Sequence, residues 1–184
     1  MPINPDLVFR AFRDWLVEES GLSWGQSLKD WTSGIKTCFQ KLAMTFGYKA
    51  VLTSRDNKEY LVDIVWKCES PDRYLGLAME SELSKRSEDI LEDFEKLVDI
   101  KAHLKVGLFH LRANAGTKPI IDEMKKILTK QHMTFNETYL VIFLSYDDCS
   151  EKIFINAYDL DVKGITDRPI SEDSYKFPKI LQES

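Results

Sequence analysis

Residues 138–145, which read Thr-Tyr-Leu-Val-Ile-Phe-Leu-Ser, are apolar at nearly every position. A strand with one wet face alternates apolar and polar side chains, whereas a strand that is buried on both faces does not. We therefore expect a central strand here. A chain with such a strand must cover both faces of its sheet, most simply with a layer of helices on each side.

The rest of the chain supplies elements for such layers. Apolar residues recur at helical spacing in four segments: 4–19, 27–46, 84–103 and 119–131. Strand-forming residues between turn signals predict five further strands: 48–53, 59–67, 74–83, 105–111 and 152–159. The element order predicts an α/β fold with a mixed central β-sheet, flanking helices and a C-terminal β-hairpin.

The length of 184 residues fits a single domain. We expect residues 1–47 to form N-terminal helices and residues 48–111 to form the core that carries the functional site. Residues 112–160 are expected to add a helix and the terminal strands. Residues 161–184 contain glycine, prolines and many charges, which predicts a surface tail.

The charge balance restricts the function. Thirty acidic residues against 25 basic ones give a net charge of −5. This charge argues against a protein that binds nucleic acid over its whole surface. Any nucleic-acid-binding surface must therefore be local. No apolar run approaches the roughly 18 residues of a membrane span, and we expect no export signal. The three cysteines lack paired spacing, so a cytoplasmic location is expected.

Three carboxylates stand out within the expected strands. Asp63 lies in the second strand, and Glu80 and Glu82 share one face of the third, because side chains alternate along a strand. If these strands are antiparallel neighbours, the carboxylates converge and repel one another unless a cation lies among them. The alternative is that they lie apart on a solvated face. Gly76 and Ala78 on the face of Glu80 favour a covered surface.

Four segments between residues 48 and 111 carry a family resemblance. They are Val62-Asp63-Ile64, Leu77-Ala78-Met79-Glu80-Ser81-Glu82, Asp93-Phe94-Glu95-Lys96-Leu97 and Val106-Gly107-Leu108-Phe109. This set resembles the core of the PD-(D/E)xK, or restriction endonuclease-like, nuclease superfamily in its Glu-x-Glu variant. In that family an aspartate begins one strand and an acidic-x-Lys tripeptide lies on the next, within an αβββαβ core. The expected element order agrees with that core.

The resemblance implies a metal site of defined composition. Asp63 and Glu80 would bind Mg²⁺ or Mn²⁺, the carbonyl of Ser81 would join them, and water would attack a phosphodiester. Glu82 occupies the position that lysine usually holds in the family, and Val62 stands in place of proline. Both are departures from the family pattern.

Some members of the family supply the lysine from the following helix, which makes Lys96 the first candidate here. The helical wheel places Lys96 away from the apolar stripe of its helix, so a solvent-facing side chain is expected. Lys67, which would share a face with Asp63, and Lys85, which follows the third strand, are the alternatives.

The function implied by the resemblance is a metal-dependent endonuclease that hydrolyses DNA, with RNA as the alternative substrate, in restriction, phage defence or repair. A homodimer is the expected assembly, since one small site cuts one strand. The competing interpretation is a catalytically silent nuclease-like module that binds partners or serves a structural role. A protein-interaction domain is a third class, which solvated and separate carboxylates would favour.

Overall fold

The structure is a computed structural model and describes residues 3–23, 25–52, 61–69, 74–84, 86–112, 115–130, 137–161 and 166–176. Its α-helices are α1 (Pro5–Asp14), α2 (Leu28–Thr45), α3 (Ser87–Asp99) and α4 (Lys118–Lys130), and a π-helical turn, η1 (Trp15–Glu19), follows α1. The strands are β1 (Lys49–Leu52), β2 (Ile64–Lys67), β3 (Leu75–Glu82), β4 (Leu104–His110), β5 (Thr138–Asp147), β6 (Lys152–Asp161) and β7 (Thr166–Lys176).

The strands of the described residues form one seven-stranded sheet in the order β1-β2-β3-β4-β5-β6-β7. β2 is antiparallel to both of its neighbours, β3 and β4 are parallel, and β4 and β5 are parallel. β5, β6 and β7 continue as antiparallel strands. The prediction of an α/β fold with a mixed sheet is confirmed, and β5 and β6 form the expected hairpin.

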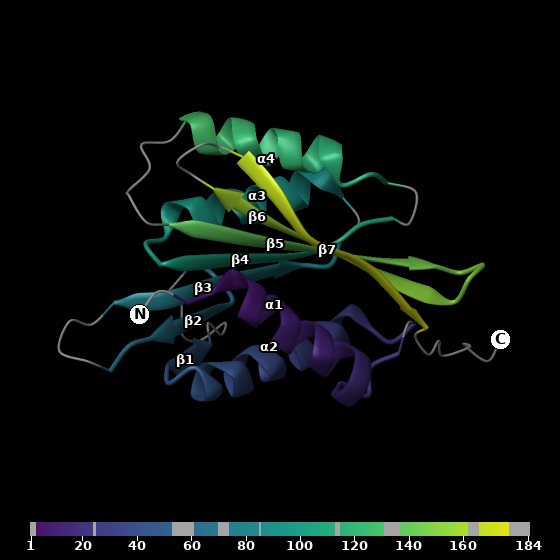
Figure 1. Cartoon of the computed structure of the whole chain (residues 1–184), viewed down its shortest axis with the longest axis horizontal. Helices are drawn as coiled ribbons and strands as arrows, with labels where there is room; N and C mark the ends of the chain where they lie inside the picture. The colour runs from purple at the N-terminus through teal and green to yellow at the C-terminus, as the bar shows by residue number, and fades with distance from the viewer. Residues whose placement is uncertain are drawn as a thin grey trace.

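Helices cover both faces of the sheet (Figure 1). α1 and α2 pack on one face through a core that includes Phe12, Phe39 and Trp66. α3 and α4 pack on the other face through a second core that includes Phe94 and Met124. β5 contributes side chains to both cores, which confirms the prediction of a central strand that is buried on both sides.

Local signals in the sequence account for the ends of the first two long helices. The Asn4 side chain accepts a hydrogen bond from the Asp6 amide at 2.9 Å, and the Ser27 hydroxyl accepts one from the Asp30 amide at 3.2 Å. Such caps satisfy amides that have no partner within the helix. Gly47 follows α2 with φ +77°, a conformation that glycine adopts without strain.

The expected surface tail is wrong for residues 166–176, which form β7. This strand pairs with β6 from Asp161↔Thr166 to Lys152↔Lys176. Pro169 is accommodated because β7 is the last strand of the sheet, where one row of amides needs no partner strand. Residues 162–165 and 177–184 lie outside the described residues. No helix within the described ranges is long and apolar enough to cross a membrane.

Candidate metal centre

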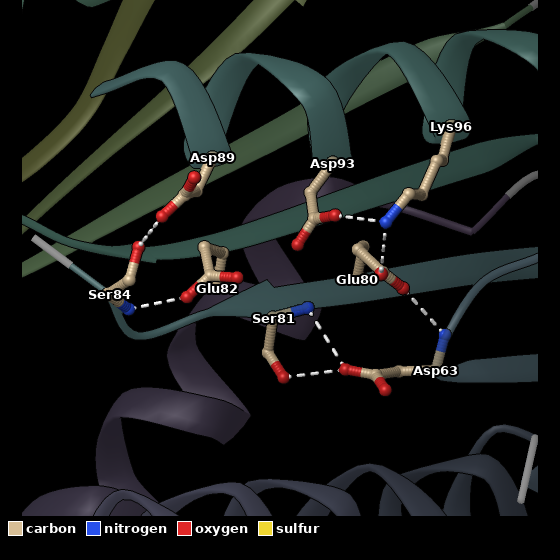
Figure 2. A network of polar contacts seen from close by, with 8 residues as sticks. All are labelled: Asp63, Glu80, Ser81, Glu82, Ser84, Asp89, Asp93 and Lys96. Atoms are coloured by element: carbon tan, nitrogen blue, oxygen red, sulfur yellow. Dashed lines mark hydrogen bonds and ion pairs between the residues drawn. The ribbon is translucent and has the colours of Figure 1, made fainter. Parts of the chain in front are cut away.

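The candidate site lies where the antiparallel ladder between β2 and β3 ends. The last pair of this ladder is Ile64↔Met79, so Asp63 and Glu80 would be the next pair. Instead, the Asp63 amide donates to Glu80 Oε2 at 2.7 Å, and Asp63 Oδ2 accepts from the Ser81 amide at 3.2 Å and hydroxyl at 2.7 Å (Figure 2). Beyond the ladder, the two chain segments are therefore joined by side-chain carboxylates that accept hydrogen bonds from backbone amides.

This arrangement corrects the expected position of Asp63. The strand predicted at 59–67 begins at Ile64, and residues 61–63 form a bend. Val62, rather than Asp63, packs with Val65 and Ala78, so the alternation of side chains breaks at Asp63. Its carboxylate turns toward Ser81, away from α3 (Figure 2). Residues 59 and 60 lie outside the described residues.

A lysine that sequence reasoning missed contacts Asp63. Lys36 Nζ of α2 lies 2.7 Å from Asp63 Oδ1, and both side chains are about three-quarters buried, at 25% and 21% exposed. No local pattern marked Lys36, because its partner belongs to another element far along the chain. Asp63 therefore forms an ion pair with Lys36 through Oδ1 and accepts two hydrogen bonds from Ser81 through Oδ2.

Glu80 is the most perturbed carboxylate of the site. It lies on the face of β3 toward α3 and is only 8% exposed. Burial, together with the nearby carboxylates of Asp63 and Asp93, raises the pKa of Glu80 to about 8. The Asp63 amide and the Lys96 ammonium oppose this rise in pKa without cancelling it. Perturbed carboxylates of this kind are common at functional sites.

Lys96 joins the site from α3. Its Nζ lies 2.5 Å from Asp93 Oδ1 and 4.0 Å from Glu80 Oε1 (Figure 2). The expectation of a solvent-facing Lys96 holds only in part, because the side chain is 37% exposed while its flexible stem directs Nζ to Asp93 and Glu80. The hydrogen bond with Asp93 raises the pKa of Lys96.

Asp93 is a second site residue that was not singled out from the sequence. It is buried in α3, and burial raises the pKa of its carboxyl, with Glu82 and Asp63 acting in the same direction. The signal that could have found it is its spacing of three residues from Lys96, which places both on one helix face.

Glu82 belongs to another hydrogen-bonded group on the same side of β3. Its carboxylate accepts a hydrogen bond from the Ser84 amide, and the Ser84 hydroxyl donates to Asp89 at 2.7 Å (Figure 2). Glu82 also lies near enough to Asp93 to raise its pKa. The structure therefore brings Asp63 into contact with Glu80, while Glu82 is engaged at the turn between β3 and α3.

Of the two alternative lysines, only Lys67 lies within the described residues, and it does not enter this geometry. Lys67 lies at the far end of β2, level with Leu75 rather than with Glu80. Lys85 lies outside the described residues. Lys96 is therefore the candidate lysine that the structure places beside Glu80.

The donor atoms suit a hard divalent cation. Asp63 and Glu80 offer carboxylate oxygens, the ligand type that Mg²⁺ and Mn²⁺ prefer. Burial first, and the carboxylates of Asp63 and Asp93 second, raise the pKa of Glu80, and a bound cation would favour its ionised form. Within the part of the chain that the structure describes, no three His, Cys, Asp or Glu side chains are already grouped as metal ligands.

No protein-family model matches the chain, and no curated protein matches its sequence.

Proposed function

We propose that the chain is a nuclease that hydrolyses phosphodiester bonds of DNA with Mg²⁺ or Mn²⁺. Asp63, Glu80 and Lys96 carry the proposal, because they come from three elements and meet at the open end of the β2–β3 ladder. The succession α2-β1-β2-β3-α3-β4 supports it, since this is the αβββαβ order of the nuclease core that the sequence resembles.

The proposed roles follow from the contacts. Asp63 and Glu80, with the carbonyl of Ser81, would hold the divalent cation. When bound, the cation supplies Lewis-acid stabilisation of the charge that develops on the phosphodiester in the transition state. Glu80 also accepts a hydrogen bond from the Asp63 amide at 2.7 Å, which holds the backbone of Asp63 beside the Glu80 carboxylate.

Lys96 would act as a cation rather than as a base. Asp93 accepts its hydrogen bond at 2.5 Å and raises its pKa, so the ammonium keeps its proton at neutral pH. A compact ammonium with three donors suits a phosphate oxygen or the attacking water. Asp93 is a positioning residue, because it directs Lys96 toward Glu80.

Cleavage assays on duplex DNA, single-stranded DNA and RNA with Mg²⁺ or Mn²⁺ test the proposal. We expect Glu80→Gln and Asp63→Asn each to lower the cleavage rate by more than about 100-fold, and Lys96→Ala by a similar factor. Glu95→Gln and Lys101→Ala are matched controls, because both side chains are exposed near the same helix, and they should cleave like wild type.

Two results would contradict the proposal. One is a wild-type protein that cleaves none of these substrates with either metal, which would favour the silent binding module. The other is a Glu80→Gln variant, folded by circular dichroism, that cleaves at the wild-type rate. For duplex substrates, the proposed homodimer predicts a sedimentation mass of two chains under the conditions in which both strands are cut.

A further inference from the structure

The contact between Lys36 and Asp63 places a positive charge on a proposed cation ligand. Asp63 Oδ1 lies 2.7 Å from the Lys36 ammonium, and Asp63 Oδ2 accepts both Ser81 hydrogen bonds. The pair is mostly buried, so solvent screens it less than a surface pair. Lys36 therefore supplies Asp63 with the kind of charge that a metal ion would supply.

The other charges of the site indicate that the Lys36 ammonium and a divalent cation would repel each other if both contacted Asp63. Lys96, on the opposite side of β3, already pairs with Asp93 and approaches Glu80. With Lys36 on Asp63, two ammonium groups face the three carboxylates of Asp63, Glu80 and Asp93. A divalent cation that contacted Asp63 beside Lys36 would repel that ammonium at short range.

We propose that Lys36 is a built-in competitor of the divalent cation, paired with Asp63 in the cation-free protein and displaced from that carboxylate when a cation binds. This inference rests on the cation-binding part of the proposed function. Lys36 holds the Asp63 carboxylate in place before the cation arrives, and the free energy needed to break this ion pair lowers the affinity of the wild-type protein for the cation.

Calorimetric titration of the full chain with Mn²⁺ at low ionic strength tests the inference without any cleavage step. Lys36→Met and Lys36→Gln should each bind Mn²⁺ about tenfold more tightly than wild type, because a nearby positive charge has been removed. Lys36→Arg, which keeps the charge, and Lys41→Met, an exposed lysine of the same helix, should stay within about twofold of wild type.

Each outcome separates this inference from the nuclease proposal. If Lys36→Met and Lys36→Gln bind Mn²⁺ no more tightly than a wild type that cleaves with Mn²⁺, the inference is overturned and the nuclease proposal stands. If they bind more tightly but wild type cleaves nothing, the inference stands alone. If no variant binds Mn²⁺, both fail.

A second readout covers the case in which these substitutions unfold the protein. The Nζ signal of Lys36 in the nitrogen-15 NMR spectrum of wild type should shift when Mg²⁺ is added, as the ion pair with Asp63 opens. The Lys41 signal serves as the internal control. A Lys36 signal that stays unchanged at a Mg²⁺ concentration that saturates the site would overturn the inference.

Discussion

At the scale of single residues, Glu80 and Asp63 do two things at once. Each carboxylate accepts a backbone amide at the end of the β2–β3 ladder, and each is proposed to bind the cation. Burial and like-charged neighbours raise the pKa of Glu80 to about 8, so the ionised form of this carboxyl is disfavoured in the folded protein. Without a cation, Glu80 is therefore largely protonated at neutral pH, and a bound cation would favour the ionised form.

The raised pKa of Glu80 predicts a specific pH dependence of stability in the absence of metal. The folded state holds a proton that the unfolded state releases above a pKa near 4.5, so the free energy of unfolding falls as the pH rises from about 4.5 to about 8 and levels off above. Glu80→Gln removes this contribution. With a chelator present, the stability of the variant relative to wild type should rise by on the order of 4 kcal/mol between pH 5 and pH 9.

Urea unfolding at several pH values measures this effect. Glu95→Gln, on the exposed side of α3, reports what the loss of a surface carboxylate does by itself. A stability difference between Glu80→Gln and wild type that stays constant from pH 5 to pH 9 would show that Glu80 does not hold the proton.

At the scale of elements, a buried lysine links β4 to its neighbours. Lys105 Nζ is fully buried and donates to Glu137 Oε2 at 2.7 Å, to the Tyr139 hydroxyl at 2.9 Å and to the Val98 carbonyl at 3.1 Å. All three of its donors have partners, which offsets the desolvation that lowers its pKa. This contact joins the start of β4 to β5 and to the end of α3.

Lys105→Ala should therefore destabilise the fold strongly. The substitution leaves Glu137 and the Tyr139 hydroxyl without this donor and opens a gap, so we expect a loss of about 3 kcal/mol in the free energy of unfolding. Lys101→Ala, an exposed lysine just after α3, should change it by less than about 0.5 kcal/mol. Equal effects of the two substitutions in urea denaturation would refute the structural role of Lys105.

Periodicity allowed most elements to be predicted, but not the contacts that join them. β5 could be predicted because it is apolar on both faces, and the long helices could be predicted from their apolar stripes and capping residues. β7 was missed because Pro169 and its charges conceal a pairing with β6 that depends on the sheet edge. The late start of β2, at Ile64, was missed because Asp63 bonds to Ser81 through its side chain instead of extending the strand.

The candidate site was predictable to a similar extent. The alternation of residues in β3 and the family resemblance singled out Asp63, Glu80, Ser81, Glu82 and Lys96 as candidates, of which the structure places Glu82 in a separate hydrogen-bonded group. The same reasoning could not find Lys36, since its ion pair joins α2 to the start of β2. It also misjudged the direction of Lys96, because a helical wheel places the Cβ atom but not the end of a long flexible side chain.

At the scale of the whole molecule, the sheet separates two helical layers, and the site lies between them at the end of the β2–β3 ladder (Figures 1 and 2). Lys36 approaches from α2 and Lys96 from α3, so positive charge reaches the site from both layers. The chain as a whole carries a net charge of −5. Under the proposed function, attraction for a nucleic acid would have to be local to this site, where a bound cation would add to the charge of the two lysines.

Diffraction from crystals of the full chain grown with Mn²⁺, measured at the manganese absorption edge, tests the central claim most directly. We expect an anomalous peak within coordination distance of the carboxylate oxygens of both Asp63 and Glu80. The peak should disappear in Glu80→Gln crystals. Crystals at saturating Mn²⁺ in which neither carboxylate contacts a peak would contradict the claim that these residues form a divalent-metal site.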